Sequence, residues 1–337
     1  MTSGETTERT AAAKAGTGPL VEVRDLTVSF ASTQGPVQAV NGVGFEVGAG
    51  EVLGLIGESG CGKSVTLRAL MRLLPEQRAR VAGRIMVAGE DVLAMQPQRL
   101  GKYRGGTAAM IFQDPGLALD PVFTVGQQIS ETVRRHWRCS RQQARERALE
   151  MLEKVKLPSA RTRMDSFPHE LSGGMRQRVM IALALSCDPT LVLADEPTTA
   201  LDATVQIQVL LIFRELQQRM GMSALFVTHD LGVAAEICDR IVVMYAGRIV
   251  ERGTAQDILL RPRHPYTHAL LASTIHGSLR GSRIQGIAGA PPDLARLPAG
   301  CAFRDRCPRA MAVCASVVPP LVEAASAGHA LACHAEA

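Results

Sequence analysis

The chain has 337 residues, of which 46% are hydrophobic and 20% charged, so it can bury a sizeable core and is not a disordered protein. The 37 Lys and Arg residues against 32 Asp and Glu give a formal net charge of +5, which suits an anionic ligand or a position near a membrane without proving either. Aromatic residues make up only 4%, so the sequence does not predict stacking platforms for single-stranded nucleic acid.

The first 19 residues are rich in Thr, Ala and Gly and lack the apolar core of a secretory signal. We expect them to form a disordered tail. No apolar run elsewhere approaches the ~18–20 residues that cross a bilayer. These patterns predict a protein that is kept in the cytosol, where disulfides are rare.

Strand patterns alternate with helical patterns along the next part of the chain. The predicted strands are 21–30, 43–47, 52–56, 191–194, 224–227, 241–244 and 248–250. The predicted helices are 63–74, 204–220 and 231–238. The first two strands show the alternation of half-buried antiparallel strands, and the third is continuously apolar, as in a buried parallel strand. This order predicts an α/β fold with a mainly parallel sheet.

The middle and the end of the chain depart from this alternation. Two helices predicted at 125–135 and 141–156 indicate a helical insertion at about 114–171. Beyond the strands, Pro, Gly, Ala and Cys dominate the composition. The predicted division of the chain is a tail at 1–19, an α/β unit at 20–260 and a C-terminal appendage at 261–337.

The segment Gly57-Glu58-Ser59-Gly60-Cys61-Gly62-Lys63-Ser64 matches the phosphate-loop pattern G-x-x-x-x-G-K-[ST]. It stands between a predicted strand and a predicted helix, which is the context that the pattern requires. Backbone N–H groups of such a loop and of the helix N-terminus surround phosphate oxygens. We expect Lys63 to bridge the β- and γ-phosphates and Ser64 to bind Mg²⁺. The alternative is a chance glycine-rich turn, which the flanking elements disfavour.

Two acids follow the predicted strand 191–194. We expect Asp195 to hold Mg²⁺, directly or through water, and Glu196 to polarise an attacking water. An acid-rich helix N-terminus is the alternative interpretation. The phosphate loop in the same chain favours the metal and catalytic roles.

The segment Leu171-Ser172-Gly173-Gly174-Met175-Arg176-Gln177-Arg178 resembles the signature sequence of ATP-binding-cassette (ABC) ATPases. Three further residues are similar to family motifs in the family's order, over about residues 20–260: Gln113 of the Q-loop, Asp202 of the D-loop and the switch histidine His229. The resemblance implies a P-loop ABC ATPase core with an antiparallel β subdomain and a helical subdomain, followed by the Cys-rich appendage.

The same resemblance implies the ligands and the site residues. The ligand would be ATP with Mg²⁺, and Phe30 would stack on the adenine. The implied catalytic residues are Lys63, Gln113, Glu196 and His229. The implied Mg²⁺ ligands are Ser64, Gln113 and Asp195. The other implied nucleotide contacts are Gly57, Glu58, Ser59, Gly60, Cys61, Gly62, Val65, Ser172, Gly173 and Gly174.

The signature also implies partners, because in ABC ATPases it grips the nucleotide of a second subunit in a head-to-tail dimer. This chain carries one phosphate loop and one signature, so the resemblance implies a second ATPase subunit, expected to be a paralogue. It further implies two transmembrane permease subunits, an extracytoplasmic solute-binding protein acting indirectly, and a place on the cytoplasmic face of the membrane. A soluble ABC protein acting on DNA or ribosomes is the alternative, and we predict no nucleic-acid partner.

Two segments of the sequence resemble one particular subfamily of the ABC ATPases. His264-Pro265-Tyr266-Thr267-His268-Ala269-Leu270-Leu271 is similar to the start of the C-terminal region in dipeptide and oligopeptide permease ATPases. The stretch 111–121 also resembles that subfamily, with Asp120 where Asn is usual. The resemblance implies an importer of peptides, with nickel or glutathione as alternative cargo.

Four cysteines crowd the end of the chain as C-x5-C-x6-C-x18-C: Cys301, Cys307, Cys314 and Cys333. In a reducing compartment such spacing favours a metal site over disulfides. The resemblance implies a [4Fe-4S] cluster, with a structural zinc or unmetallated thiols as alternatives. Cys61 is either an incidental small residue or a reactive thiol, because a helix N-terminus lowers a thiol pKa.

Overall fold

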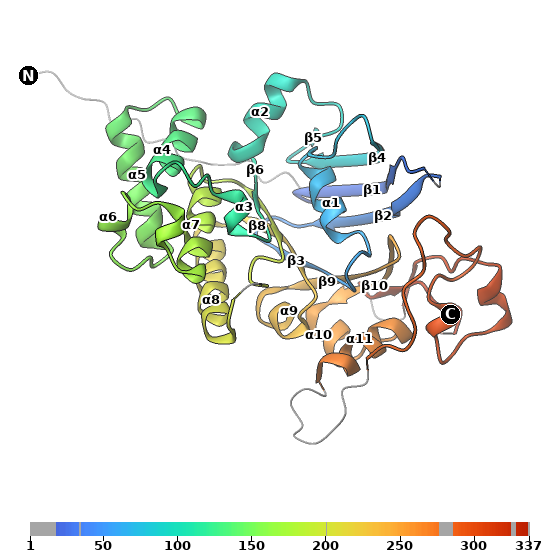
Figure 1. Cartoon of the computed structure of the whole chain (residues 1–337). Helices are drawn as coiled ribbons and strands as arrows, with labels where there is room; N and C mark the ends of the chain where they lie inside the picture. Colours follow the sequence, from blue (N-terminus) through green and yellow to red (C-terminus); the bar gives the residue numbers. More distant parts are fainter. Residues whose placement is uncertain (1–17, 34, 200, 276–285, 325–327, 336–337) are drawn as a thin grey trace, which may run out of the picture.

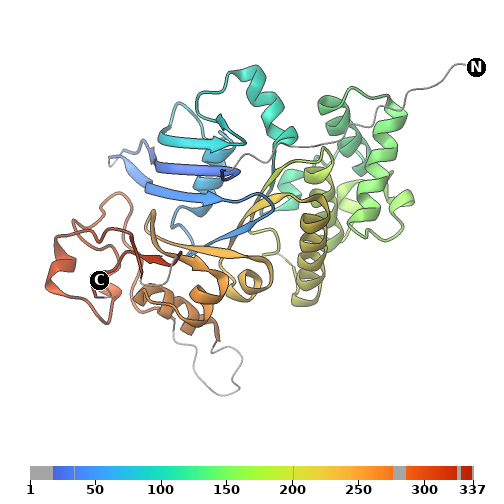
Figure 2. The same cartoon turned by 180° about the vertical axis from the view of Figure 1, so that it is seen from behind.

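A computed structural model describes residues 18–33, 35–199, 201–275, 286–324 and 328–335. The expected tail therefore lies almost entirely outside the described residues. Figures 1 and 2 show the described chain as two β-sheets, a group of helices on one side and a C-terminal part on the other.

The smaller sheet is antiparallel, as the alternation near the start of the sequence predicts. Its order is β2-β1-β4-β5, with strands β1 (Val21–Phe30), β2 (Val37–Val47), β4 (Ala79–Val87) and β5 (Glu90–Asp91). Inward-facing residues such as Val23, Val43 and Phe45 are buried in it. The antiparallel sheet and one face of the larger sheet thus share one hydrophobic core.

The larger sheet has eight strands among the described residues, in the order β11-β12-β10-β9-β3-β8-β7-β6. Its bounds are β3 (Val52–Ile56), β6 (Ala108–Ile111), β7 (Leu191–Asp195), β8 (Ser223–Thr228), β9 (Arg240–Tyr245), β10 (Arg248–Thr254), β11 (Val322–Glu323) and β12 (Ala330–Leu331). The strands from β9 to β6 pair in parallel, and all five residues of β3 are buried. Their carboxyl ends therefore meet at one edge, where ligands of such sheets bind.

Some helices pack around the larger sheet, and the others form a separate group beside it, called the lateral group here. The helices of the core are α1 (Lys63–Leu70), α2 (Pro97–Gly106), α8 (Ala203–Met220), α9 (Leu231–Ile237), α10 (Ala255–Leu260) and α11 (Pro265–Ile275). The lateral group holds α3 (Pro115–Ala118), α4 (Val125–His136), α5 (Arg141–Lys154), α6 (Ala160–Arg163) and α7 (Gly173–Leu185). Capping boxes at Thr124 and Ser140 fix the starts of α4 and α5. Their buried faces, with Ile129, Val133 and Leu152, join the core of α7.

The predicted helix over 63–74 is too long at its C-terminal end. Helix α1 stops at Leu70, and Arg72 takes a left-handed φ of 51°. The Arg104 Nε donates a hydrogen bond to the Met71 carbonyl at 2.9 Å, so a partner outside the helix satisfies a carbonyl at its end. Strand β2 also begins six residues before the predicted 43–47.

The C-terminal segment, by which we mean residues 286–324 and 328–335, packs on the core and is not detached from it. Strand β12 pairs antiparallel with β10 and so extends the larger sheet. Phe303 is buried against the rings of Tyr245 and Tyr266. In the described part of the chain, no helix combines the length and apolarity required to cross a membrane.

Candidate functional site

The predicted phosphate loop joins β3 to α1 and turns around its glycines. Gly57 has φ 152° and Gly62 has φ 107°, values that disfavour any side chain. A Cβ at Gly57 would come within 2.2 Å of the Met244 carbonyl oxygen, and one at Gly62 within 2.5 Å of the Ala39 oxygen. The loop therefore requires glycine for both conformation and space.

Lys63 begins α1 and is only 5% exposed. Its Nζ donates hydrogen bonds to the carbonyl oxygens of Gly57 at 2.7 Å and Glu58 at 2.9 Å. The ammonium group thus lies across the inside of the loop. Phosphate oxygens entering the loop would meet this positive charge together with the backbone N–H groups of the loop.

Ser64 and Asp195 meet at the carboxyl edge of the sheet. The Ser64 Oγ donates a hydrogen bond to the Asp195 Oδ1 at 2.7 Å. Burial raises the pKa of the Asp195 carboxyl, and the hydrogen bond from Ser64 partly offsets that shift. A hydroxyl beside a buried carboxylate forms the oxygen donor set that Mg²⁺ prefers, so these residues fit the ion that the phosphate loop implies.

Glu196 stands directly after β7 in a left-handed conformation, with φ 45°. Its Oε2 accepts a hydrogen bond from the Thr199 Oγ1 at 2.9 Å and lies 3.0 Å from the His229 Nδ1. A left-handed conformation is uncommon for a non-glycine residue. The carboxylate and the imidazole are therefore held together at the mouth of the site.

One cleft of about 580 Å³ brings most of the predicted residues together. Its lining residues are Ala39, Gly57, Glu58, Ser59, Gly60, Gly62, Lys63, Ser64, Val65, Gln113, Glu196, His229, Leu270 and Ser273. Gln113, two residues after β6, reaches it from the side of the helical group. The arrangement places cationic, acidic and amide side chains around one space that can hold a polyphosphate.

Sequence reasoning missed three residues of this cleft: Ala39 of β2, and Leu270 and Ser273. Leu270 and Ser273 belong to α11, more than 200 residues after the phosphate loop. The segment 264–271 stood out in the sequence only as a mark of the subfamily. No local pattern there indicates contact with a phosphate loop.

Six predicted nucleotide contacts do not line the cleft. Cys61 is buried within the phosphate loop and Asp195 bonds Ser64, whereas Phe30, Ser172, Gly173 and Gly174 lie elsewhere in the chain. Ser172 is the N-cap of α7, where its Oγ accepts a hydrogen bond from the Met175 N–H at 3.3 Å, and Gly173 and Gly174 open that helix. Phe30 ends β1 and is half-buried beside the small sheet. Within one chain, these last four residues stay apart from the phosphate loop.

The interpretation of Cys61 as a reactive thiol is wrong. The side chain is buried, and burial raises the pKa of the thiol despite the nearby Lys63 ammonium. Its Sγ lies 3.8 Å from the Lys63 Nζ. The loss of hydration outweighs the favourable charge, so the residue acts as a small packing group.

The four C-terminal cysteines are free thiols that influence one another. Burial raises the pKa of Cys301 and Cys307; the other three thiols raise that of Cys301 further, and Cys314 and Cys333 raise that of Cys307. Among the residues that the structure describes, however, no three His, Cys, Asp or Glu side chains are arranged to hold a metal ion. The expected metal site is therefore not formed in the described part of the chain.

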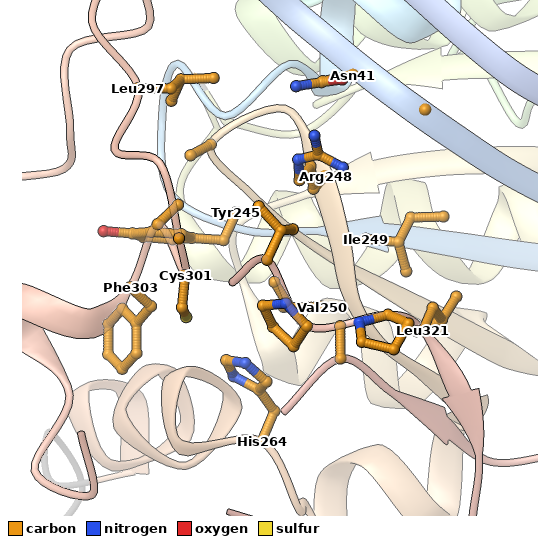
Figure 3. A pocket seen from close by; sticks show the side chains of 18 of the residues that line it. Asn41, Tyr245, Arg248, Ile249, Val250, His264, Leu297, Cys301, Phe303 and Leu321 are labelled. Carbon is orange, nitrogen blue, oxygen red and sulfur yellow. The ribbon is translucent and has the colours of Figure 1, made fainter. Parts of the chain in front are cut away.

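A second cavity of about 370 Å³ lies between the β9–β10 hairpin and the C-terminal segment (Figure 3). Arg248 and His264 line it, with Cys301 and Phe303. Burial lowers the pKa of Arg248, and it lowers that of His264 to about 4, so this imidazole is neutral at neutral pH. Apart from Cys301, no predicted site residue reaches this cavity.

A phosphate loop on a parallel sheet, with two acids at the carboxyl end of another strand of the same sheet, defines a P-loop nucleotide hydrolase. Two family models match: ABC transporter over residues 40–199, and the oligopeptide/dipeptide transporter C-terminal region over residues 250–314. The chain belongs to the ABC transporter ATPases that carry this C-terminal region, which confirms the resemblance stated from the signature.

Curated relatives cover nearly the whole chain. The probable peptide ABC transporter ATP-binding protein y4tR of Sinorhizobium fredii is 50% identical, over 93% of this chain and 94% of its own. The dipeptide transport ATP-binding protein DppD of Bacillus subtilis is 47% identical, over 89% and 90%. The oligopeptide transport ATP-binding protein OppD of Salmonella typhimurium is 48% identical, over 93% of both chains.

Solved structures share the fold. A dimeric post-hydrolysis state of the ATP-binding cassette MJ0796, bound to ADP and phosphate, superposes with a TM-score of 0.63 at 27% identity. It covers 70% of this chain and 98% of its own. The α/β core with an antiparallel sheet and a helical part is thus the ABC ATPase fold.

Proposed function

We propose that this protein is the ATP-hydrolysing subunit of an ABC importer of peptides. The observation that carries the proposal is the single cleft that joins the phosphate loop, the Ser64–Asp195 pair and the Glu196–His229 pair. The curated relatives named for peptide, dipeptide and oligopeptide transport support the cargo class.

The chain's own residues position the nucleotide. Lys63 exchanges its bonds to the loop carbonyls for bonds to the β- and γ-phosphates, because charged oxygens are better acceptors than neutral ones. Ser64, Asp195 and Gln113 would hold Mg²⁺, which when bound neutralises charge on the phosphates. Phe30 stacks on the adenine, and the loop backbone from Gly57 to Val65 surrounds the phosphates.

Glu196 and His229 handle the reacting water. The Glu196 carboxylate orients the water and accepts its proton, and the leaving ADP departs opposite to the attack. His229, held at 3.0 Å from that carboxylate, keeps it aimed at the γ-phosphate. Since little covalent chemistry is left to the protein, positioning and charge supply the catalysis.

A second ATPase subunit completes the site. Ser172, Gly173 and Gly174 begin α7 away from this chain's own cleft, so they are free to contact the nucleotide of a partner. Their N–H groups at a helix start form an anion site. We propose a head-to-tail dimer with a paralogue.

The membrane partners dock beside Gln113. Four apolar side chains are exposed over residues 112–123, among them Leu117 at 89% and Val122 at 69%; the others are Phe112 and Phe123. Clustered apolar exposure of this kind marks an interaction surface. We propose that two permease subunits cover it at the cytoplasmic face of the membrane, where a solute-binding protein acts indirectly from the other side.

For the four C-terminal cysteines we propose a [4Fe-4S] cluster, with zinc as the alternative. The support is the donor set, four thiols in one C-terminal segment, with Cys301 in electrostatic contact with the other three. Cys301, Cys307, Cys314 and Cys333 would supply the four thiolates of such a cluster. When bound, it would tie together the loops of the C-terminal segment.

Reconstitution tests the function. This chain, its partner ATPase and the permease subunits in vesicles should hydrolyse ATP faster when a loaded peptide-binding protein is added. Stimulation by nickel or glutathione in place of peptides would change the cargo. A complex that hydrolyses no ATP under any of these conditions would refute the proposal.

A further inference from the structure

The C-terminal segment contacts the phosphate loop directly through Arg306. The Arg306 Nη1 donates to the Glu58 Oε2 at 2.7 Å, and the Nη2 donates to the Glu58 Oε1 at 2.9 Å. Two parallel bonds of this kind form the strongest arrangement of an arginine with a carboxylate. The two residues lie 248 positions apart in the sequence.

The Arg306 guanidinium is fixed in place by hydrogen bonds to carbonyl, carboxylate and hydroxyl oxygens and by two neighbouring aromatic rings. The Arg306 side chain is only 5% exposed. Its Nε donates to the Ala288 carbonyl at 3.0 Å, its Nη2 to the Ile287 carbonyl at 3.2 Å, and its Nη1 lies 3.2 Å from the Tyr245 hydroxyl. The rings of Tyr245 and Phe303, both visible in Figure 3, lie within 6 Å of its Cζ.

Glu58 is in turn tied to the catalytic lysine. Its carbonyl accepts a hydrogen bond from the Lys63 Nζ at 2.9 Å, and its N–H donates to the Tyr266 hydroxyl at 2.8 Å. Its carboxylate is a negative charge on a loop that must accept the phosphates of ATP. Left unpaired, that carboxylate would repel the incoming nucleotide and could compete for Lys63.

We propose that Arg306 is a positioning residue for nucleotide binding: it holds the Glu58 carboxylate against the C-terminal segment and offsets its charge. The phosphate loop then presents Lys63 to the phosphates without a competing anion. The C-terminal segment is thereby part of the nucleotide site. This inference rests on the proposed function, since it assumes that the cleft binds ATP.

The test measures the dissociation constant of MgATP for the full chain and its variants. Arg306→Gln should raise it about tenfold, because it leaves an unpaired carboxylate in the loop. Arg306→Lys should recover part of the loss, since it keeps the charge but not the paired bonds. Glu58→Gln/Arg306→Gln should return to within about threefold of the unaltered chain, because the repelling charge is gone.

Arg304→Gln is the matched control, because it removes the same charge from the same short 3-10 helix, Arg304–Arg306. Arg304 bonds Asp305 and the Ala315 carbonyl and does not reach the loop, so its MgATP affinity should be unchanged. Normal MgATP binding by Arg306→Gln would overturn the proposal. A double variant as weak as Arg306→Gln would also overturn it, because Arg306 would then act only on folding. Failure of the unaltered chain to bind MgATP would refute the proposed function instead.

Discussion

At the scale of single residues, the site combines strained and desolvated groups. Glu196 is held in a left-handed conformation, and Asp195 is a carboxyl at only 3% exposure. Both arrangements cost folding free energy in the absence of ligand. A site of this kind gains that free energy back when nucleotide and metal bind.

Asp195→Asn tests this cost directly. Because burial raises the pKa of Asp195, the ionised carboxylate destabilises the folded state at any pH above that raised pKa. We expect the asparagine variant without nucleotide to melt at a higher temperature at pH 7. The gain should shrink as the pH falls through the raised pKa and vanish at about pH 3, below the ordinary pKa, where the aspartic acid is protonated in both states.

Thermal denaturation with and without MgATP provides the check. The variant should also lose most of the stabilisation that MgATP gives, because a metal ligand has been removed. An asparagine variant that melts lower than the unaltered chain at pH 7, or that keeps full stabilisation by MgATP, would contradict this assignment.

At the scale of elements, four of the five parallel strands of the larger sheet were predicted from their apolar runs, and β6, with only four residues, was missed. Strands β3, β7 and β8 are continuous apolar runs, and each matches its predicted range to within one residue at either end. Strand β4 was missed because its Arg80, Gly83 and Arg84 interrupt the alternation, and pairing with β1 overrides that local pattern.

The residues of the candidate site show the same difference between what a local pattern predicts and what tertiary packing decides. Motifs with a fixed local spacing, such as the phosphate loop and Asp195-Glu196, could be read from the sequence. Contacts made by tertiary packing could not: Leu270 reaches the cleft from α11, and Arg306 reaches Glu58 across 248 positions. The burial of Cys61 likewise depends on neighbours that no local pattern reveals.

Ser172→Arg tests the role of the start of α7. This residue lies outside the chain's own cleft, so binding of MgATP to the isolated chain should change less than about twofold. Hydrolysis by the assembled complex should fall strongly, because a bulky cation would occupy the place of the partner's phosphates. A mixed-subunit assay in which the variant impaired only nucleotide binding to its own loop would refute the head-to-tail dimer.

At the scale of the whole molecule, the C-terminal segment is joined to the core by β12, by the ring cluster around Phe303 and by Arg306. A ligand that orders the loops of the C-terminal segment can therefore influence the nucleotide cleft. Its four cysteines are the residues through which a bound metal would do so.

Metal analysis of anaerobically purified protein tests that part of the account. We expect a brown protein with about four iron atoms per chain. Replacing Cys301, Cys307, Cys314 or Cys333 by Ser should remove the colour, whereas Cys139→Ser and Cys187→Ser should keep it. Stoichiometric zinc without iron would replace the cluster by a zinc site, and the absence of both metals would leave the cysteines as packing residues.

The measurement that tests the central claim most directly is ATP turnover by the reconstituted complex with Glu196→Gln. The amide keeps the shape of the side chain but cannot accept the proton of the attacking water. The account predicts that the variant binds MgATP normally, hydrolyses it about a hundredfold more slowly or worse, and accumulates a closed dimer with ATP between the subunits. Hydrolysis at the normal rate would contradict the assignment of Glu196 and, with it, the proposed mechanism.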